Sequence, residues 1–170
     1  VALFYQAVYI DKTLAGEGAY RKPLERVLTP PGTSDSRHLG DNNAMPATAT
    51  PLPLHEHLRC HARETPDRTA YLWYGQPITW AQLDTASDAF AARLQALGAA
   101  KGEPVALFMN NCPQYVMAHY GIQKIGAIVC PCGPLNKEHE LEYQLTDLQA
   151  RVIVAADVLL PVVDKVRAST

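Results

Sequence analysis

The sequence has no strong excess of charge and no apolar run long enough to span a membrane. Its 170 residues include 15 Lys and Arg against 17 Asp and Glu, which gives a net charge of −2. This balance predicts no basic surface for nucleic acid. The best apolar run, VIVAADVLLPVV, is interrupted by Asp157 and Pro161, whereas a bilayer span needs about 18 to 20 apolar residues. We therefore expect no nucleic-acid partner and no transmembrane segment, and only peripheral membrane contact stays open.

Cysteine is scarce as well. The four cysteines do not form a dense disulfide framework for a chain of this length, and they are Cys60, Cys112, Cys130 and Cys132. The opening stretch VALFYQAVYI resembles a short signal core, but it lacks the preceding basic residues of a secretory signal. Both observations favour a reducing compartment, and we expect a cytoplasmic location.

Familiar catalytic and phosphate-binding motifs are missing too. The sequence contains no GxSxG elbow, no GxGxxG and no GxxxxGK[ST] loop. Ser87 is expected on the polar side of its helix. The carboxylates of Glu138, Glu140 and Glu142 cluster at a helix start, where they favour the helix dipole rather than catalysis. The residues by themselves therefore predict no catalytic side chain.

The first third of the chain differs in composition from the rest. Residues 29–53, TPPGTSDSRHLGDNNAMPATATPLP, are rich in Pro, Ser, Thr, Gly and Asn, which is typical of a linker. The chain begins with Val1, and Met45 would suit a natural start, so residues 1–44 are interpreted as an upstream extension. Residues 1–53 are thus predicted to form a poorly ordered N-terminal arm, with a weak helical pattern near 20–28.

Residues 54–170 carry the pattern of a folded domain. Residues 54–64 suit a helix that ends before Pro66, and TAYLWYG and PITW predict a hairpin around Gly75-Gln76. Thr79 and Gln82 match a capping box. The helix that follows has an apolar stripe at spacings of three and four and ends near Gly98; the stripe is Leu83, Ala86, Phe90, Leu94 and Leu97.

Strands and helices then alternate to the end of the chain. The segments EPVALFM, GAIVCP and ARVIVAA are predicted as buried strands. Helices are predicted over 113–125, from an Asn136 cap through residue 146, and over 157–168. Strands joined by helices of this length indicate crossover units, so the predicted fold class is α/β with a mainly parallel sheet.

Two clusters could bind a metal, but neither offers enough ligands. His57 and His61 lie four residues apart and share a helix face, whereas His55 and Cys60 point elsewhere. A zinc site needs three or four converging ligands, so a solvated helix face is favoured, with Leu54 and Leu58 turned inward. Cys130 and Cys132 lie on the same side of a strand, where packing as small apolar groups is favoured over a soft-metal site; the two clusters together predict no metal site.

The order of these segments resembles the N-terminal part of the adenylate-forming (AMP-binding) superfamily, and within it the acyl-CoA synthetases, or fatty acid–CoA ligases. The resemblance covers residues 54–167 and rests on TPDRTA, ITWAQLD, LGAAKGEPVALFMNN, IGAIVCP and ELEYQLTDLQARVIV in this order. It implies a large N-terminal domain followed by a small mobile one. The implied reaction joins a carboxylic acid, expected to be a fatty acid, to CoA through an acyl-adenylate, with ATP and Mg²⁺ as cofactors.

The resemblance also implies one ligand-binding segment within this chain. The loop after the GAI strand lies near the channel for the pantetheine arm of CoA, and here it includes Gly133, Pro134 and Leu135. Many relatives carry Asn-Pro where this chain has Gly133-Pro134. From the residues alone, the segment is a strand-to-helix turn.

The motifs that carry catalysis in this superfamily have no counterpart in residues 1–170. The phosphate loop, the adenine-binding segments and the mobile-domain lysine would lie beyond Thr170, so the chain is expected to be an N-terminal scaffold fragment that does not adenylate by itself. A non-catalytic α/β interaction module is the alternative, and a small metal-binding protein the third reading. Without the missing C-terminal part of its own chain, apolar surface of VALFM and RVIVA is expected to be exposed.

Overall fold

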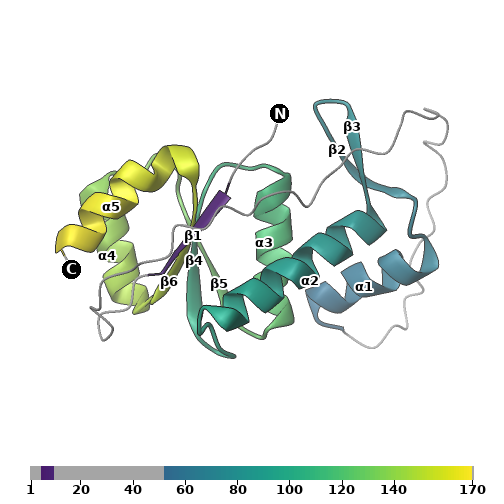
Figure 1. Ribbon diagram of the computed structural model, residues 1–170, viewed down its shortest axis with the longest axis horizontal. Helices are drawn as coiled ribbons and strands as arrows, with labels where there is room; N and C mark the ends of the chain where they lie inside the picture. The colour runs from purple at the N-terminus through teal and green to yellow at the C-terminus, as the bar shows by residue number, and fades with distance from the viewer. Residues whose placement is uncertain (1–4, 10–51, 170) are drawn as a thin grey trace.

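The apolar strands of the C-terminal half pair as a parallel sheet. The computed structural model describes residues 5–9 and 52–169 (Figure 1). Strand β4 (Pro104–Phe108) lies between β5 (Ile128–Cys132) and β6 (Val152–Ala156), parallel to both. A fourth strand, β1 (Tyr5–Tyr9), pairs antiparallel with the other side of β6, so the order is β1-β6-β4-β5. The predicted α/β fold with a mainly parallel sheet is confirmed.

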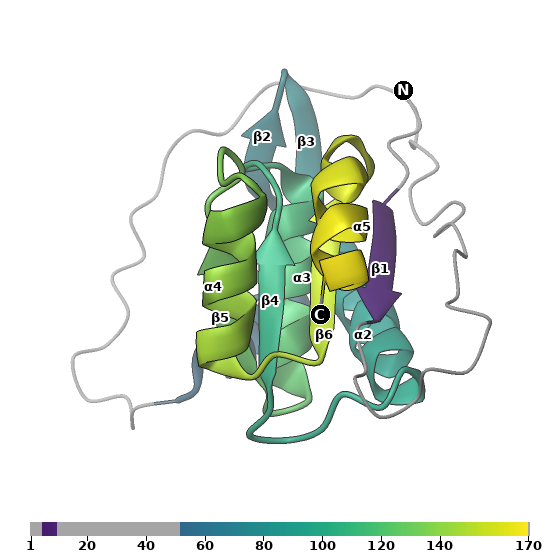
Figure 2. The same ribbon diagram turned by 90° about the vertical axis from the view of Figure 1, so that its left-hand side faces the viewer.

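Helices cover both faces of this sheet. One layer contains α2 (Trp80–Ala96) and α3 (Pro113–Lys124), and the opposite layer contains α4 (Glu138–Leu148) and α5 (Leu160–Ser169) (Figures 1 and 2). Side chains of a strand alternate between the faces, so each strand contributes to both cores. The α4–α5 side contains Ala106, Phe108, Leu141, Ile153 and Val163, and the α2–α3 side contains Leu94, Val105, Leu107, Ile122 and Val154.

A hairpin and a helix form a third, smaller core beside the main sheet. Helix α1 (Leu54–Glu64) has the predicted bounds. Strands β2 (Thr69–Trp73) and β3 (Gln76–Thr79) pair antiparallel. The turn lies one residue earlier than predicted, at Tyr74 (φ 45°) and Gly75 (φ 78°), because a two-residue hairpin of this twist needs two consecutive positive φ angles.

Helix α2 begins and ends as its sequence predicts. The Thr79 N–H donates to Gln82 Oε1 at 3.0 Å, and the Gln82 N–H donates to Thr79 Oγ1 at 3.2 Å, which completes the capping box. Gly98 follows the helix with φ 87°. Helix α3 packs closely on α2 at Gly121, where an added Cβ would lie 2.8 Å from Phe90 Cδ1. A glycine is therefore required at this helix crossing.

Several predicted details are wrong. The final helix is divided into a 3-10 turn, Asp157–Leu159, and α5. Strand β1 lies within residues 1–53, and the poorly ordered arm expected there stays a prediction; the other predictions for residues 1–4 and 10–51, the weak helix included, lie outside the described residues. The apolar residues of VALFM and RVIVA are not exposed: residues 105–109 and residues 152–155 are all at most 3% exposed, because the chain's own helices cover both faces of β4 and β6.

Candidate functional site

The loop after β5 is the one segment for which the sequence predicts ligand contact. The Asn136 N–H donates to the Gly133 carbonyl at 2.9 Å, which closes a tight turn at the carboxyl end of the strand. Leu135 lies on this turn with 88% of its surface exposed, whereas Pro134 is half-buried. Gly133, Pro134 and Leu135 thus present one apolar side chain to solvent.

Asn136 does not cap the next helix, contrary to the prediction. Its side-chain amide instead donates to Gln144 Oε1 at 2.9 Å, across the first two turns of α4. The residue before α4 is Lys137, whose N–H donates to the Glu140 carboxylate at 2.7 Å. The helix therefore starts one residue later than an Asn136 cap would place it, and Asn136 fixes the loop against the helix.

A shallow, open hollow of about 430 Å³ adjoins this loop on the outer side of α4. It is lined by Asn136, His139, Glu140, Tyr143 and Gln144. Tyr143 is 72% exposed. The lining offers hydrogen-bond donors and acceptors, an imidazole and a phenol ring, but no lysine or arginine to face a phosphate. The hollow can contact a polar ligand, and it contains no phosphate cradle.

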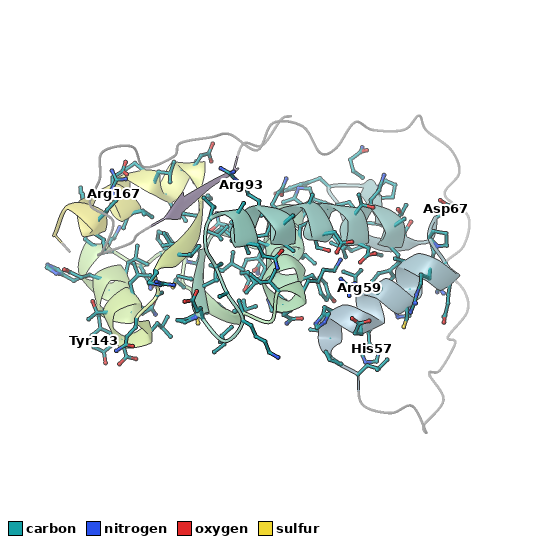
Figure 3. The ribbon with its side chains drawn as sticks, turned by 60° about the horizontal axis from the view of Figure 1, so that its bottom comes forward. His57, Arg59, Asp67, Arg93, Tyr143 and Arg167 are labelled. Atoms are coloured by element: carbon teal, nitrogen blue, oxygen red, sulfur yellow. The ribbon has the colours of Figure 1, made fainter. Side chains whose placement is uncertain are left out.

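The histidine cluster lies far from this hollow. Figure 3 shows His57 on α1 and Tyr143 on α4 in opposite halves of the molecule. The cluster faces inward more than predicted: His55, His57 and His61 are all half-buried, and the His61 ring stacks on Trp80 with centroids 4.6 Å apart. Among the described residues, no group of three or more His, Cys, Asp or Glu side chains could hold a metal ion.

The two leucines of α1 behave differently from each other. Leu58 is buried as predicted, at 1% exposed, and packs in the third core. Leu54 was expected to turn inward with it, but Leu54 is 52% exposed. It lies in the first turn of the helix, before α1 reaches its neighbours. The histidines are therefore a partly packed helix face, and the fully solvated face predicted for them is wrong.

No disulfide joins the four cysteines, and the pair on β5 is buried as packing groups. Cys130 Sγ donates to the Ile128 carbonyl and Cys132 Sγ to the Cys130 carbonyl, each at 3.7 Å. Burial raises the pKa of the Cys130 thiol, and burial together with the neighbouring Cys130 raises the pKa of Cys132 to about 11. Both thiols therefore stay protonated at neutral pH and are poor nucleophiles and metal ligands.

Ser87 is not on the polar side of α2, which corrects the prediction. The residue is fully buried, and its hydroxyl donates to the Asp84 carbonyl at 2.9 Å. Its small side chain suits the site where Gly121 of α3 approaches, because an added Cβ at Gly121 would lie 2.9 Å from the Ser87 carbonyl oxygen. Ser87 is thus a packing residue at a helix crossing.

The acidic residues at the start of α4 have structural partners. Glu138 forms an ion pair with Lys165 of α5, and the hydrogen bond from Lys165 lowers the pKa of that carboxyl. Glu140 accepts from the backbone of Lys137, as described above. These contacts agree with the predicted non-catalytic role.

Sequence reasoning missed a buried ammonium group between α2 and α3. The Lys124 side chain is 1% exposed, and its Nζ lies 2.5 Å from Asp84 Oδ1 and 2.7 Å from Asp88 Oδ1. Arg59 of α1 reaches Asp88 at 3.6 Å, so three helices share the network. The sequence feature that could have indicated this network is the spacing of Asp84 and Asp88, which lie four residues apart on one helix face. This network joins α1, α2 and α3. Because the Lys124 side chain is paired with Asp84 and Asp88, it is unavailable to bind a phosphate.

Helix α3 also carries polar atoms with no partner among the described residues. His119 Nε2 lies 2.9 Å from Gln123 Nε2, which leaves the buried His119 Nδ1 and Gln123 Oε1 without one. Burial lowers the pKa of His119. A neutral imidazole can accept this hydrogen bond, so His119 and Gln123 form a hydrogen-bonded pair along α3.

No helix of the described residues has the length and apolar character needed to cross a bilayer. The features found are a solvent-facing loop, an open hollow, buried thiols and a helix-bridging ion network. None of them combines a nucleophile with an activating base. This part of the protein is therefore best understood by comparison with known proteins.

The chain matches known proteins over most of its folded part. The family of AMP-binding enzymes matches residues 58–170. A long-chain-fatty-acid–CoA ligase of Bacillus subtilis is 44% identical over 114 residues, which are 65% of this chain and 20% of that protein. The ligase of the same description from Haemophilus influenzae is 42% identical over 105 residues, or 61% of this chain and 19% of that protein.

Solved structures give the same result. The inhibitor-bound N-terminal domain of FACL13 from Mycobacterium tuberculosis is 32% identical with a TM-score of 0.64, and the match covers 67% of this chain and 29% of that one. The anthranilate CoA ligase AuaEII, bound to anthranoyl-AMP, is 29% identical with a TM-score of 0.65, and the match covers 69% of this chain and 23% of that one. The chain spans about a fifth of the length of the curated relatives it matches. It belongs to the family of AMP-binding enzymes.

Proposed function

We propose that this chain is the N-terminal scaffold of a larger ATP-dependent acid–thiol ligase that acts on a fatty acid. The observation that carries the proposal is the 44% identity, over 114 residues, to a protein described as a long-chain-fatty-acid–CoA ligase. In the proposed reaction the fatty acid carboxylate attacks the α-phosphate of ATP, which releases pyrophosphate and gives an acyl-adenylate. The CoA thiol then attacks the acyl carbon, and AMP leaves. Magnesium accompanies ATP.

Residues 1–170 are proposed to supply structure rather than chemistry. Adenylation needs cations fixed around the phosphates. The Lys124 ammonium is occupied by Asp84 and Asp88, and the hollow beside α4 is lined by a carboxylate. The purified chain is therefore expected to show no ATP–pyrophosphate exchange with any fatty acid, and exchange above background would contradict the scaffold role.

The loop of Gly133, Pro134 and Leu135 is proposed to border the CoA channel of the complete ligase. Its support is position and exposure: it follows the carboxyl end of a parallel strand, where α/β folds bind ligands, and Leu135 is 88% exposed. An apolar side chain suits the pantetheine arm better than the charged end of CoA.

A chimera tests this loop within an active enzyme. Residues 58–170 would replace the matched segment of the Bacillus subtilis ligase, and acyl-CoA formation would be measured. We expect activity, and we expect Leu135→Asp to raise the KM for CoA about tenfold, corresponding to about 1.4 kcal/mol, with the KM for ATP unchanged. Leu72→Asp is the matched control, because Leu72 is also an exposed leucine, at 64%, but lies on β2, outside the main sheet. Equal CoA KM values for the two variants would contradict the channel assignment.

An inactive but folded chimera would instead favour a non-catalytic α/β interaction module. The proposal places the parent ligase in the cytoplasm, and the absence of a disulfide among the four cysteines supports a reducing compartment.

A further inference from the structure

We propose that His119 and Gln123 of α3 form a proton-linked switch. At neutral pH the imidazole accepts a hydrogen bond from the Gln123 amide, and in acid the imidazolium donates to the same amide, which has turned over. The pair makes the packing of α3 sensitive to acid. This inference goes beyond the proposed ligase function and does not depend on it.

The neutral state is defined by one short hydrogen bond and by the atoms it leaves without partners. His119 Nε2 lies 2.9 Å from Gln123 Nε2. The amide nitrogen can only donate, so the imidazole Nε2 is the acceptor and carries no proton. The ring proton is therefore on His119 Nδ1, which is buried and has no partner among the described residues. His119 is thus assigned the Nδ1–H tautomer.

Protonation of this tautomer requires the Gln123 amide to reverse. A second proton can enter the ring only at Nε2, where the new N–H would meet the N–H groups of the amide. The other end of the amide, Gln123 Oε1, is buried and has no partner among the described residues. Half a turn about the last side-chain bond brings Oε1 to the imidazolium and leaves the filled space almost unchanged, because this torsion is roughly two-fold. The oxygen that is unsatisfied in the neutral state therefore becomes the acceptor in the charged state.

Aromatic rings of the same helix flank the imidazole. The Tyr115 and His119 rings are stacked with centroids 6.2 Å apart, and the Tyr120 ring meets His119 edge-on at 6.0 Å. Burial raises the pKa of the Tyr120 phenol, so this neighbour stays neutral where histidine titrates. The rings therefore exclude water without supplying a negative charge. Burial accordingly lowers the pKa of His119.

The neighbouring elements supply no counter-charge either. β4 and β5 contain no charged residue, and the Cys132 thiol of β5 packs on the opposite face of the sheet. The Tyr71 hydroxyl of the hairpin donates to the Pro113 carbonyl at 3.4 Å. Ion pairs with one another or with Lys124 engage five side chains of α1 and α2, which are His55, Glu56, Arg59, Asp84 and Asp88. No ion pair within the described part of the chain includes His119, so its protonation leaves a positive charge that only the reversed amide can meet.

The switch makes the folded chain less stable in acid. Because burial lowers the pKa of His119, the unfolded chain, in which histidine titrates near 6.5, takes up the proton before the folded chain does. The contribution of His119 to stability is therefore fully present above pH 6.5 and is lost as pH falls through the folded pKa. Helix α3 packs on α2 at Gly121, so we expect the loss in the contacts between these two helices.

An NMR titration of the unaltered chain from about pH 8 to about pH 5 tests both states. At the start, the ring nitrogens of His119 should report a protonated Nδ1 and an unprotonated Nε2. On acidification, the side-chain amide signals of Gln123 should move with the same midpoint as His119, whereas those of Gln114, which has no bond to His119, should not. An Nε2–H tautomer at the start, or Gln123 signals that ignore the His119 midpoint, would overturn the proposal.

Two substitutions of glutamine by glutamate on α3 separate the contact from a general effect of charge. Gln123→Glu places a carboxylate that accepts from the imidazolium directly and should increase the proton affinity of His119 at least tenfold. Gln114→Glu is the matched control, because Gln114 is also half-buried on α3 and its Oε1 also lacks a partner among the described residues. It should change the proton affinity less than about twofold. Equal effects of the two variants would rule out the pair.

The dependence of stability on pH provides the last test. Urea midpoints of the unaltered chain should fall between about pH 6.5 and about pH 5, and the fall should be smaller in His119→Gln, which keeps a polar amide but cannot take up the proton. His139→Gln, at an exposed position on α4, is the control and should follow the unaltered chain. Identical profiles for all three chains would contradict the switch. If a variant fails to fold, the titration of the unaltered chain still decides.

Discussion

The two edges of the sheet, at β5 and at β6, are closed by different means. At β5 the closure is local: Pro131 lacks an outward donor, and Ile128 is 52% exposed, so the strand already tolerates solvent. At β6 the strand is buried on both faces, and its edge is covered by a segment more than 140 residues away in sequence. A sheet edge can therefore be closed by one residue of its own or by a distant strand.

The largest expected effect comes from placing a charge on each strand in turn. Val154→Asp buries a carboxylate where Val154 is 1% exposed, and we expect a loss of about 4 kcal/mol or more in the free energy of unfolding. Ile128→Asp is the matched variant on β5 and should cost under about 1 kcal/mol. Urea denaturation measures both. Similar losses in the two variants would refute the contrast between the edges.

The inner side of β5 should behave as core although Ile128 and Pro131 of the same strand are exposed. Burial and the neighbouring Cys130 raise the pKa of Cys132 to about 11, whereas in the unfolded chain the thiol titrates near 9. Between these values the folded state retains a proton that the unfolded state loses, so stability present below pH 9 falls as pH rises to 11. The loss is about 3 kcal/mol.

Cys132→Ala isolates this contribution, because it removes the thiol and leaves the other groups that titrate in alkali. Denaturation midpoints between pH 8 and 11 should fall less steeply in the variant than in the unaltered chain. Cys60→Ala, at a half-buried position on α1, is the control and should keep the original slope. Parallel slopes for all three chains would show that Cys132 is not buried as a thiol.

A smaller effect is expected where β5 leads into its loop. An added Cβ at Gly133 would lie 2.9 Å from Asn136 Oδ1, so Gly133→Ala should displace that side chain and break its bond to Gln144. We expect a cost of about 1 kcal/mol. In an Asn136→Ala background the same change should cost almost nothing, which a double-mutant cycle measures. Additive losses would mean that the two residues do not interact.

The smallest change in stability is expected for Pro131→Val, which restores an outward N–H to β5. The free energy of unfolding should change by less than about 0.5 kcal/mol, because the position is exposed. Self-association should increase with protein concentration, since the edge becomes able to pair. Sedimentation velocity measures it, with Pro161→Val, at an exposed position in α5, as the control. A monomeric Pro131→Val variant would show that the proline does not close this edge.

The local elements were largely predictable because their signals lie within a few residues. The bounds of α1, the capping box at Thr79 and the strand around Val105 all follow from short patterns. The loop of Gly133, Pro134 and Leu135 was proposed from resemblance, and its contact with CoA stays a prediction. The errors at Ser87 and Leu54 have one cause: periodicity assigns a helix face, but the neighbouring helix decides whether that face is covered.

The sequence by itself determined the parallel sheet, since buried apolar strands separated by helices leave few other arrangements. Pro131 lacks an N–H wherever it stands, but only the strand order places β5 at an edge of the sheet. Only the tertiary structure decided that Lys124 is buried between two aspartates and that Tyr5–Tyr9 pairs with β6. Both are contacts between segments far apart in the chain. No local sequence pattern encodes them, because each segment by itself could equally face solvent.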